Sequence, residues 1–271
     1  MDLRTDQFRG RHVFVAGGSS GINLGIAQAF ARAGARLFII SRSADKVAAA
    51  VAQLQALGTE AQGQSADVRH PDALEAAYAQ AVARFGPIDV LISGAAGNFL
   101  ARAADLSPNA FKTVVDIDLL GSFNVVRAAY PHLRRPGASV VQISAGQSFI
   151  ATPFQIHACA AKAGVDMLTR VLALEWGAEG IRINSIAPGP IADTEGLKRL
   201  APGAEALQAM AERVPLKRLG TLDDIARVAL MLCSDWGSYI TGTVIPVDGG
   251  LALTGPRDFS AAAAASARSR A

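Results

Sequence analysis

The chain has little of what marks disulfide-rich, metal-binding or membrane-spanning proteins. Its 271 residues include only two cysteines, Cys159 and Cys233, whose spacing fits neither a disulfide framework nor a metal site. No stretch reaches the roughly 18 consecutive apolar residues that a membrane helix needs. We therefore expect two buried free thiols, no bound metal and no membrane-spanning segment.

Charge is also scarce, and it is balanced. Charged residues make up 18% of the chain, and 26 basic side chains against 23 acidic ones give a net charge of +3. Nucleic-acid binding usually needs a concentrated basic surface, so we expect no nucleic-acid partner. The N-terminus lacks the apolar run of a signal peptide, and Ser269-Arg270-Ala271 at the C-terminus does not match the Ser-Lys-Leu peroxisomal signal. These absences predict a cytoplasmic protein.

Apolar residues, at 51% of the chain, are what the sequence has in abundance. Short runs rich in Val and Ile predict strands at His12–Ala16, Leu37–Ile40, Val90–Ser93, Val140–Ser144, Arg182–Ala187 and Val244–Val247. Longer stretches between them predict helices at Ala44–Leu57, Pro71–Phe85, Pro108–His132 and Ile156–Ala178. This alternation predicts a doubly wound α/β domain, with helices on both faces of a parallel sheet. We expect one domain over residues 1–260, a lid around 189–214 and a disordered tail over 261–271.

A glycine-rich turn follows the first predicted strand. It reads Gly17-Gly18-Ser19-Ser20-Gly21-Ile22-Asn23, and a predicted helix begins at Leu24. In such a turn, backbone N–H groups and the positive end of the helix dipole can bind a pyrophosphate. Glycines also mark ordinary tight turns, but the position between the first strand and its helix favours a nucleotide site. The predicted contacts are Gly17, Ser19, Ser20, Gly21 and Ile22.

The pattern Gly17-x-x-x-Gly21-Ile22 resembles the cofactor turn of the short-chain dehydrogenase/reductase family. The similarity continues in order to Asp248-Gly249-Gly250 and covers roughly residues 8 to 252. It implies a nicotinamide dinucleotide cofactor bound by further residues along the chain. By this resemblance Asp67 and Val68 border the adenine, Ala95 contacts the cofactor, and Pro188, Gly189 and Ile191 line the nicotinamide.

Two positions depart from the family's pattern. Asn23 replaces the third glycine of the turn, and we expect it to adopt the left-handed backbone that asparagine tolerates. The family's Asn-Asn-Ala-Gly run after the fourth strand is Ser93-Gly94-Ala95-Ala96 here. The loss of its asparagine puts the local hydrogen bonding in doubt, although not the fold.

The end of the second predicted strand indicates which dinucleotide is bound. Sites for NAD generally place an acidic residue there, to bind the ribose 2′-hydroxyl. Here the strand ends in Ser41 and Arg42, so no carboxylate repels a 2′-phosphate and a guanidinium can bind one. Arg42 could instead be an ordinary solvated loop residue. The missing acid together with the arginine favours NADP(H).

The family's usual catalytic tyrosine is missing. Lys162 matches the lysine of the family's Tyr-x-x-x-Lys motif, but Ala158 stands at the tyrosine position. Ala145 stands where the family has its serine, thirteen residues before the tyrosine. Ordinary ketone reduction therefore loses its general acid. Either the protein only binds the nucleotide, or it protonates something other than a ketone oxygen.

Further residues make the chain similar to the 2,4-dienoyl-CoA reductases, the peroxisomal branch above all. These are Asp118 at the family's catalytic asparagine position, the run that contains Asn98 and Phe99, and His157 before Ala158. The resemblance implies that Asp118 supplies a proton, directly or through a water, while Lys162 holds the nicotinamide ribose. It places Asn98 and Phe99 in the substrate wall. His157 could polarise the thioester, hold a water or be purely structural.

Three hypotheses remain open. The leading one is NADPH-dependent reduction of 2,4-dienoyl-CoA to enoyl-CoA, an auxiliary step of unsaturated fatty-acid β-oxidation. The second is another short-chain reductase with an enoyl or carbonyl substrate, and the third is a catalytically silent NADP-binding sensor. The resemblance also implies a homotetramer that associates through the predicted helices Pro108–His132 and Ile156–Ala178.

Overall fold

The computed structural model describes residues 7–201 and 203–254, so the predicted tail at 261–271 lies outside the described residues. One sheet carries seven parallel strands in the order β3-β2-β1-β4-β5-β6-β7. The strands are β1 (His12–Ala16), β2 (Arg36–Ser41), β3 (Ala61–Ser65), β4 (Val90–Ser93), β5 (Ser139–Ile143), β6 (Arg182–Pro188) and β7 (Val244–Val247). The predicted doubly wound α/β fold is confirmed.

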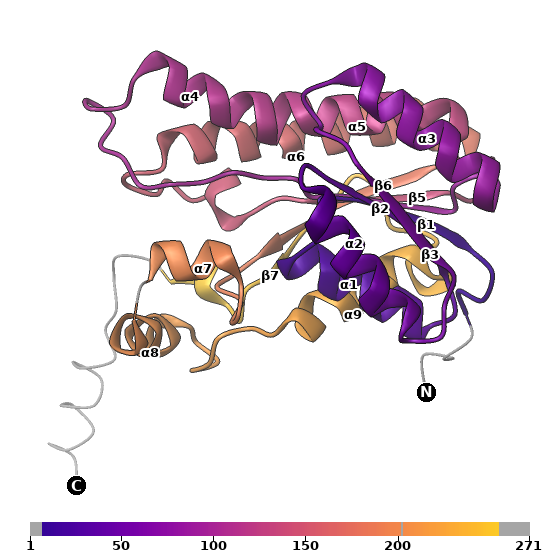
Figure 1. Ribbon diagram of the computed structural model, residues 1–271. Helices are drawn as coiled ribbons and strands as arrows, with labels where there is room; N and C mark the ends of the chain where they lie inside the picture. Colours follow the sequence, from indigo (N-terminus) through magenta and orange to yellow (C-terminus); the bar gives the residue numbers. More distant parts are fainter. Residues whose placement is uncertain (1–6, 202, 255–271) are drawn as a thin grey trace, which may run out of the picture.

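Helices cover both faces of this sheet, as Figure 1 shows. One layer consists of α1 (Gly21–Arg32), α2 (Ala44–Gln55) and α9 (Leu222–Cys233). The other consists of α3 (Pro71–Phe85), α4 (Pro108–Val115), α5 (Gly121–Ala129) and α6 (Ile156–Trp176). Alternate residues of each strand face opposite layers: Val13 and Val15 of β1 pack in the first core, Phe14 and Ala16 in the second. Strands buried on both faces explain the continuous apolar runs.

The element boundaries differ from the expectations at informative places. Strand β3, with the sequence AQGQS, carries no apolar run, because it lies at the edge of the sheet and is only partly buried. The helix predicted over Pro108–His132 is interrupted by one turn of π-helix at Asp116–Leu120, and a 3₁₀ turn follows Ala129. Of the two thiols, Cys233 is buried as expected, whereas Cys159 is only half-buried.

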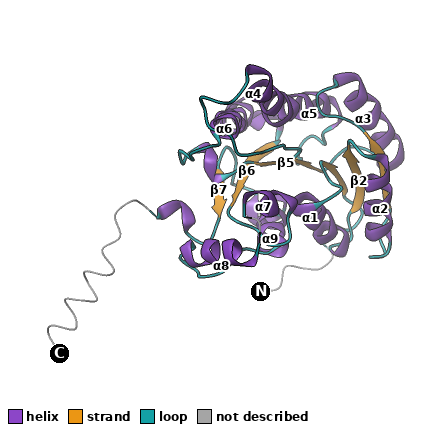
Figure 2. Ribbon diagram, turned by 60° about the vertical axis from the view of Figure 1, so that its left-hand side comes forward, coloured by secondary structure: helices purple, strands orange, loops and turns teal. Residues whose placement is uncertain are grey.

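The segment 189–214 forms two short helices, α7 (Glu195–Leu200) and α8 (Ala204–Arg213). Both lie outside the two main helical layers, and Figure 2 shows α8 below α7. No residue of α8 is buried among the parts of the chain that the structure describes. That this segment moves as a lid stays a prediction.

The strand order fixes where a ligand can bind. The chain runs outward from β1 through β2 to β3, and then crosses back to place β4 on the other side of β1. At such a switch point, the loops after β1 and β4 diverge and leave a crevice at the carboxyl ends of the strands. Over the described residues, no helix is long and apolar enough to cross a membrane, and no metal-binding cluster of side chains is found.

His12, the first residue of β1, is a buried histidine at the amino end of this central strand, away from the crevice. Its side chain is fully buried, its Nδ1 lies 2.8 Å from the carbonyl oxygen of Gly86, and its ring packs edge-on against Phe85. Burial lowers the pKa of His12 to about 4, against the opposing effects of the Gly86 hydrogen bond and of Asp89. Nearby Arg36 adds to the lowering.

We predict that His12 makes the protein less stable as the pH falls from 6.5 toward 4. The unfolded chain takes up a proton near pH 6.5, whereas the folded chain resists it until about pH 4. Between pH 7 and pH 5 the free energy of unfolding should therefore fall by about 2 kcal/mol on account of this residue. Urea unfolding at both pH values measures it, and the His12→Gln variant should show a smaller fall. An equal fall in both proteins would contradict the prediction.

Candidate active site

Asp118 lies at the centre of the π-helical turn between α4 and α5. Its side chain is 1% exposed, and its Oδ1 accepts a hydrogen bond from the backbone N–H of Gly97 at 2.7 Å. The extra residue of a π turn redirects the neighbouring side chains, and such turns are frequent at functional sites. Close packing of this turn on α6 depends on Gly164, where a Cβ would lie 2.8 Å from Leu119. The local backbone thus carries the carboxylate against α6.

Lys162 of α6 is the cation next to this carboxylate. Its Nζ lies 3.6 Å from Oδ2 of Asp118 and donates to the carbonyl oxygen of Ile143, at the end of β5, at 2.9 Å. Both side chains are buried. Burial raises the pKa of Asp118, although Lys162, the Gly97 N–H and His157 each act to lower it. The carboxyl group is therefore easier to protonate than an exposed aspartate, even beside an ammonium group.

His157, five residues before Lys162 on α6, is fully buried next to the loop after β4. Its Nε2 lies 3.1 Å from the carbonyl oxygen of Phe99, and its ring stacks on the Phe99 ring with the centroids 4.4 Å apart. The predicted substrate residue Asn98 donates from its amide to Oε1 of Gln155 at 3.1 Å. Gln147 donates to the same oxygen at 2.9 Å. These contacts bind the loop after β4 to the start of α6.

Residues that the sequence did not single out complete this region. Gln155 is buried and joins Asn98 to Gln147, but no motif marks either glutamine. Phe149, Ile150 and Phe154 are exposed apolar side chains in the segment before α6. A hydrogen bond from Ala101 N–H to the Phe154 carbonyl ties this segment to the loop after β4. An unusual exposure of apolar side chains is visible only in three dimensions.

The glycine-rich turn has the geometry that a pyrophosphate needs. Gly17 and Gly21 have positive φ angles of 79° and 56°, and a Cβ on Gly17 would lie 2.9 Å from the Ala95 backbone nitrogen. Helix α1 begins at Gly21, and within the described chain the Ser20 side chain does not cap it. Unpaired N–H groups of a first helical turn attract phosphate oxygens. The residues present therefore fit the dinucleotide, and Ala95 borders the turn, while its contact with the cofactor stays a prediction.

The ends of β2 and β3 gather charged side chains beside this turn. Ser41 ends β2, and Arg42 after it is exposed. Arg69, which the sequence did not indicate, holds the carboxylate of Asp67 with a shortest contact of 2.6 Å. Arg69, aided by Arg42, lowers the pKa of Asp67 to about 2. Val68 is buried against Gly121 of α5, where a Cβ would overlap it.

The predicted nicotinamide side is formed by the chain that leaves β6. Pro188 ends this strand, and Gly189 lies so close to Asp248 that a Cβ would stand 2.6 Å from its Cα. Ile191 is buried and pairs with Gly220 through an isolated parallel bridge. The close backbone approach explains why glycine occupies position 189. All three predicted residues thus lie at the carboxyl ends of the strands.

Comparisons with known proteins identify the family. The family model described as enoyl-(acyl carrier protein) reductase matches residues 16–252. The peroxisomal 2,4-dienoyl-CoA reductase [(3E)-enoyl-CoA-producing] of Pongo abelii is 47% identical over 93% of this chain and 87% of its own. A short chain dehydrogenase from Bacillus anthracis, 37% identical, matches with a TM-score of 0.84 over 93% of this chain and 100% of its own. The chain belongs to the short-chain dehydrogenase/reductase family.

A third relative differs in its stated product. The probable 2,4-dienoyl-CoA reductase [(2E)-enoyl-CoA-producing] of Bacillus subtilis is 38% identical over 88% of this chain and 95% of its own.

The absence of the family's tyrosine is not repaired from elsewhere in the chain. Ala158 is buried at that position. Tyr78 is buried and donates to the Val125 carbonyl, and Tyr130 donates to Glu179. The remaining tyrosine, Tyr239, lines a cavity at the amino ends of the strands, on the side of the sheet away from Lys162. Asp118 and Lys162 are therefore the buried titratable pair at this site.

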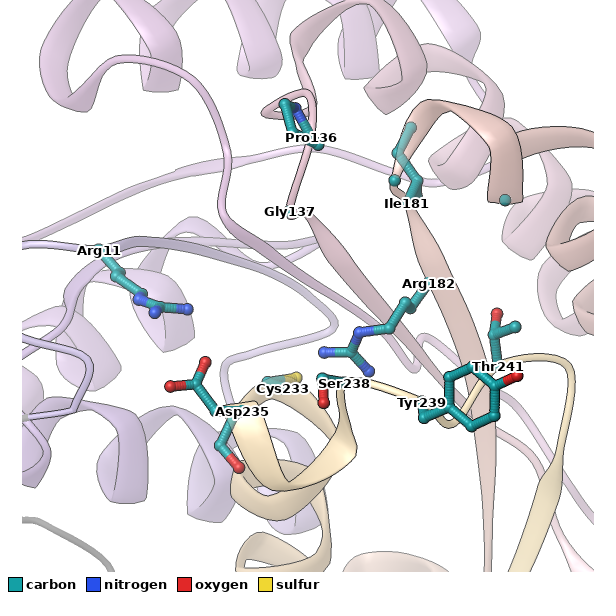
Figure 3. A pocket seen from close by; sticks show the side chains of 13 residues that line it. Arg11, Pro136, Gly137, Ile181, Arg182, Cys233, Asp235, Ser238, Tyr239 and Thr241 are labelled. Atoms are coloured by element: carbon teal, nitrogen blue, oxygen red, sulfur yellow. The ribbon is translucent and has the colours of Figure 1, made fainter.

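That cavity, of about 610 Å³, lies at the amino ends of β5 and β6 and is shown in Figure 3. Arg11, Arg182 and Asp235 contribute charged side chains to its wall. Arg182 is engaged in structure, because it donates to the Leu232 carbonyl at 2.6 Å and so caps the end of α9. Asp118 and Lys162 stand at the carboxyl ends of the strands, so the cavity is separate from them.

The structure corrects the expected backbone of Asn23 and shows what bridges the turn at Gly94, where the family's asparagine is missing. Asn23 does not adopt a left-handed backbone but lies within α1, buried. Its Nδ2 donates to the carbonyl oxygen of Gly94 at 2.8 Å and lies 3.3 Å from that of Gly17. A Cβ on Gly94 would overlap the Asn23 amide. The two departures from the family's pattern therefore compensate, since the amide at position 23 joins the turns after β1 and β4.

We predict that positions 23 and 94 are coupled. Gly94→Asn alone should destabilise the protein by about 1–3 kcal/mol, because the new side chain overlaps Asn23. Asn23→Gly alone should cost about 1–2 kcal/mol, because buried hydrogen bonds are lost. In the double variant Asn23→Gly/Gly94→Asn the combined loss should fall at least about 1 kcal/mol short of the sum. Urea unfolding of the four proteins measures the coupling, and strict additivity would refute it.

Proposed function

We propose that this protein reduces 2,4-dienoyl-CoA thioesters with NADPH and yields the (3E)-enoyl-CoA. The observation that carries the proposal is the buried pair of Asp118 and Lys162 beside an alanine at the family's tyrosine position. A phenol that protonates a ketone oxygen is missing, whereas a carboxyl group with a raised pKa is present. The stated activity of relatives at 47% identity supports the same reaction. We propose that this reaction serves the breakdown of unsaturated fatty acids.

The reaction needs groups that stabilise an anion and protonate a carbon atom. When bound, the reduced nicotinamide supplies a hydride, which adds to the far end of the conjugated system, at C5. The resulting dienolate carries negative charge on the thioester oxygen, C2 and C4. Protonation at C2 gives the (3E)-enoyl product, whereas protonation at C4 gives the (2E)-enoyl product. The position of the proton donor therefore decides which product forms.

The residues of the site divide this work. Lys162 contributes a buried positive charge, which favours the dienolate and orients the cofactor ribose. Asp118 holds a proton that it can release, because its burial favours the neutral form. Once ionised, Asp118 is stabilised by Lys162 and by the Gly97 N–H. Asn98 and Phe99 form the wall against which we place the acyl thioester.

We predict consumption of NADPH with trans-2,4-dienoyl-CoA esters and almost none with 3-ketoacyl-CoA. Asp118→Asn should lower kcat by roughly 10²-fold, because an amide cannot donate the carboxyl proton, and should leave NADPH affinity little changed. Lys162→Ala should lower both kcat and the affinity for NADPH. Loss of the absorbance of the reduced nicotinamide measures turnover, and nucleotide titration measures affinity.

The other two hypotheses correspond to defined outcomes of this experiment. Turnover of a 3-ketoacyl-CoA without turnover of any dienoyl-CoA would favour another reductase of the family. Tight NADPH binding without turnover of either would favour the nucleotide sensor. In both cases the proposed function would be wrong.

The choice of NADPH over NADH rests on Arg42 and on Ser41 at the end of β2. A charge-assisted contact with the 2′-phosphate contributes about 1.5–3 kcal/mol, so NADPH should bind at least about 10-fold more tightly. Arg42→Ala should remove most of this preference. Lys46→Ala, an exposed cation on α2, is the matched control. Equal affinities of the unmodified protein for the two nucleotides would refute the assignment.

Assembly and compartment are further proposals. Exposed apolar side chains lie on α5, α6 and the π turn, namely Leu120, Phe123, Met167, Val171 and Leu174, of which Leu174 is 86% exposed. Such a surface favours burial against another copy, and we propose a homotetramer with dihedral symmetry, which light scattering can measure. The relative from Pongo abelii is named peroxisomal, and the compartment of this protein stays a prediction that fluorescence microscopy can test.

A further inference from the structure

Five large apolar side chains are exposed in the loops after β4 and β5. They are Phe99, Leu100, Phe149, Ile150 and Phe154, each between 36% and 55% exposed, and we call them the apolar rim. Over the described part of the chain, none of the five belongs to either hydrophobic core. A single exposed apolar residue is ordinary, whereas a group of them on neighbouring loops marks a surface that binds a ligand or a partner.

Hydrogen bonds join the two loops into one surface. Strands β4 and β5 are paired neighbours, so their loops leave the same edge of the sheet side by side. The N–H of Ala101 donates to the Phe154 carbonyl at 3.0 Å, and the Asn98 amide donates to Gln155 at 3.1 Å. The apolar rim is therefore carried by one connected pair of loops.

The backbone of Phe154 is strained. Its φ angle of 66° lies in the left-handed region, which a bulky side chain rarely adopts. In this conformation the ring is 55% exposed, so burial of the ring in a core does not offset the strain. Strained residues of this kind gather at ligand sites, where the surrounding structure holds them in place. The conformation of Phe154 thus favours a ligand on the apolar rim.

The apolar rim adjoins the buried pair of Asp118 and Lys162. Gly97, whose N–H donates to Asp118 at 2.7 Å, lies two residues before Phe99. Ile143, whose carbonyl accepts from Lys162 at 2.9 Å, ends the strand from which the second loop leaves. A molecule held at the pair can therefore extend along the rim.

Charge decides which part of a dienoyl-CoA fits this surface. Neither residues 98–101 nor residues 148–156 include a charged side chain. The phosphates of coenzyme A favour cationic surroundings, whereas the acyl tail is a hydrocarbon. In the proposed reaction the hydride adds at C5, and the carbons beyond C5 form the tail that points away from the thioester. The uncharged rim matches that tail and not the coenzyme.

We propose that the apolar rim binds the acyl tail beyond C5, with Phe154 as its principal contact, and that the protein thereby favours long-chain 2,4-dienoyl-CoA esters. This inference rests on the proposed function and names the substrate class within it. Burial of apolar surface is the attraction that the rim offers, and it grows with each methylene group of the tail. The rim therefore acts on the affinity for substrate and not on the proton transfer.

The length dependence of the unmodified protein is the first measurement. Full burial of one methylene group corresponds to about a 4-fold gain in affinity. Contact with the rim leaves the other side of the tail in water, so only part of this gain is expected for each group. We expect kcat/KM to be about 10- to 100-fold higher for dodeca-2,4-dienoyl-CoA than for hexa-2,4-dienoyl-CoA. Equal values for the two esters would overturn the proposal.

The Phe154→Asn variant removes the ring but keeps a residue that tolerates the left-handed backbone. We expect kcat/KM for the dodecadienoyl ester to fall by about 5-fold or more, through KM, and that for the hexadienoyl ester to change by less than about twofold. The Tm should not fall, because asparagine relieves the strain. Tyr239→Asn, which removes an exposed ring at the amino ends of the strands, is the matched control and should leave both values unchanged.

Other results for Phe154→Asn would contradict the assignment. An equal loss with both esters, or a lower Tm with no change in the length dependence, would make Phe154 a structural residue of its turn. A smaller assembly by light scattering with an unchanged length dependence would make the rim a contact between copies of the chain. Phe154→Gly, which also accepts the left-handed backbone, repeats the comparison if the asparagine variant fails to fold.

Binding of saturated acyl-CoA esters tests the rim without turnover. Dodecanoyl-CoA should bind the NADP⁺-loaded protein about 10-fold more tightly than hexanoyl-CoA, and Phe154→Asn should remove most of the difference, as calorimetry can measure. If this holds while no dienoyl-CoA is reduced, the proposed function is wrong and the rim still binds an acyl tail. If dienoyl esters are reduced without any length dependence, the proposed function stands and this inference fails.

Discussion

Two opposite charges, on Asp118 and Lys162, are buried side by side at the carboxyl edge of the sheet, and the surrounding structure has to stabilise them. Removing a carboxylate and an ammonium from water costs several kcal/mol for each ion, which their mutual attraction only partly offsets. The fold adds a backbone N–H from Gly97 for one and the carbonyl of Ile143 for the other. The Nζ–Oδ2 distance of 3.6 Å leaves the pair loose enough for the acid to remain protonatable.

The positions of Asp118 and Lys162 depend on how neighbouring backbone segments pack against one another. The bond from Gly97 to Asp118 requires the loop after β4 to approach the π turn, and Gly164 lets that turn approach α6. The position of the loop in turn depends on the Asn23 amide, which fixes the turn after β4 against the glycine-rich turn. The glycine-rich turn, the loop after β4 and the π turn are thus mechanically linked. A change in the first turn is felt at the acid, although the two have no direct contact.

Much of this architecture could be predicted because it depends on short, local patterns. Apolar strand runs, the glycine-rich turn and the position of Lys162 all follow from residue type and spacing. The polar edge strand β3 could not be found that way, since edge strands need no apolar run. Nor could the π turn, because Asp116–Leu120 reads as an ordinary helix and only packing against α6 reveals the extra residue.

Among the site residues, too, those marked by a local motif were predicted, and those that depend on contacts between distant segments were not. Asp118 and Lys162 were expected together, and their side chains do meet, whereas His157 contacts Phe99 on the loop that also holds Asp118. The link formed by Gln155 and the pairing of Arg69 with Asp67 were missed. Each depends on a contact between segments that no sequence spacing encodes. The misjudged backbone of Asn23 has the same origin, since its partner Gly94 is 71 residues away.

The Asn23 bridge also has an evolutionary consequence. Asparagine at positions 23 and 94 at once is disfavoured, because the second side chain overlaps the first. A lineage that moves the amide from one turn to the other therefore passes through glycine at both positions or asparagine at both. With two glycines the turns are free of overlap but unbridged, and with two asparagines the side chains are crowded. Each intermediate is less stable than either end state, so the exchange is open only to chains with stability to spare.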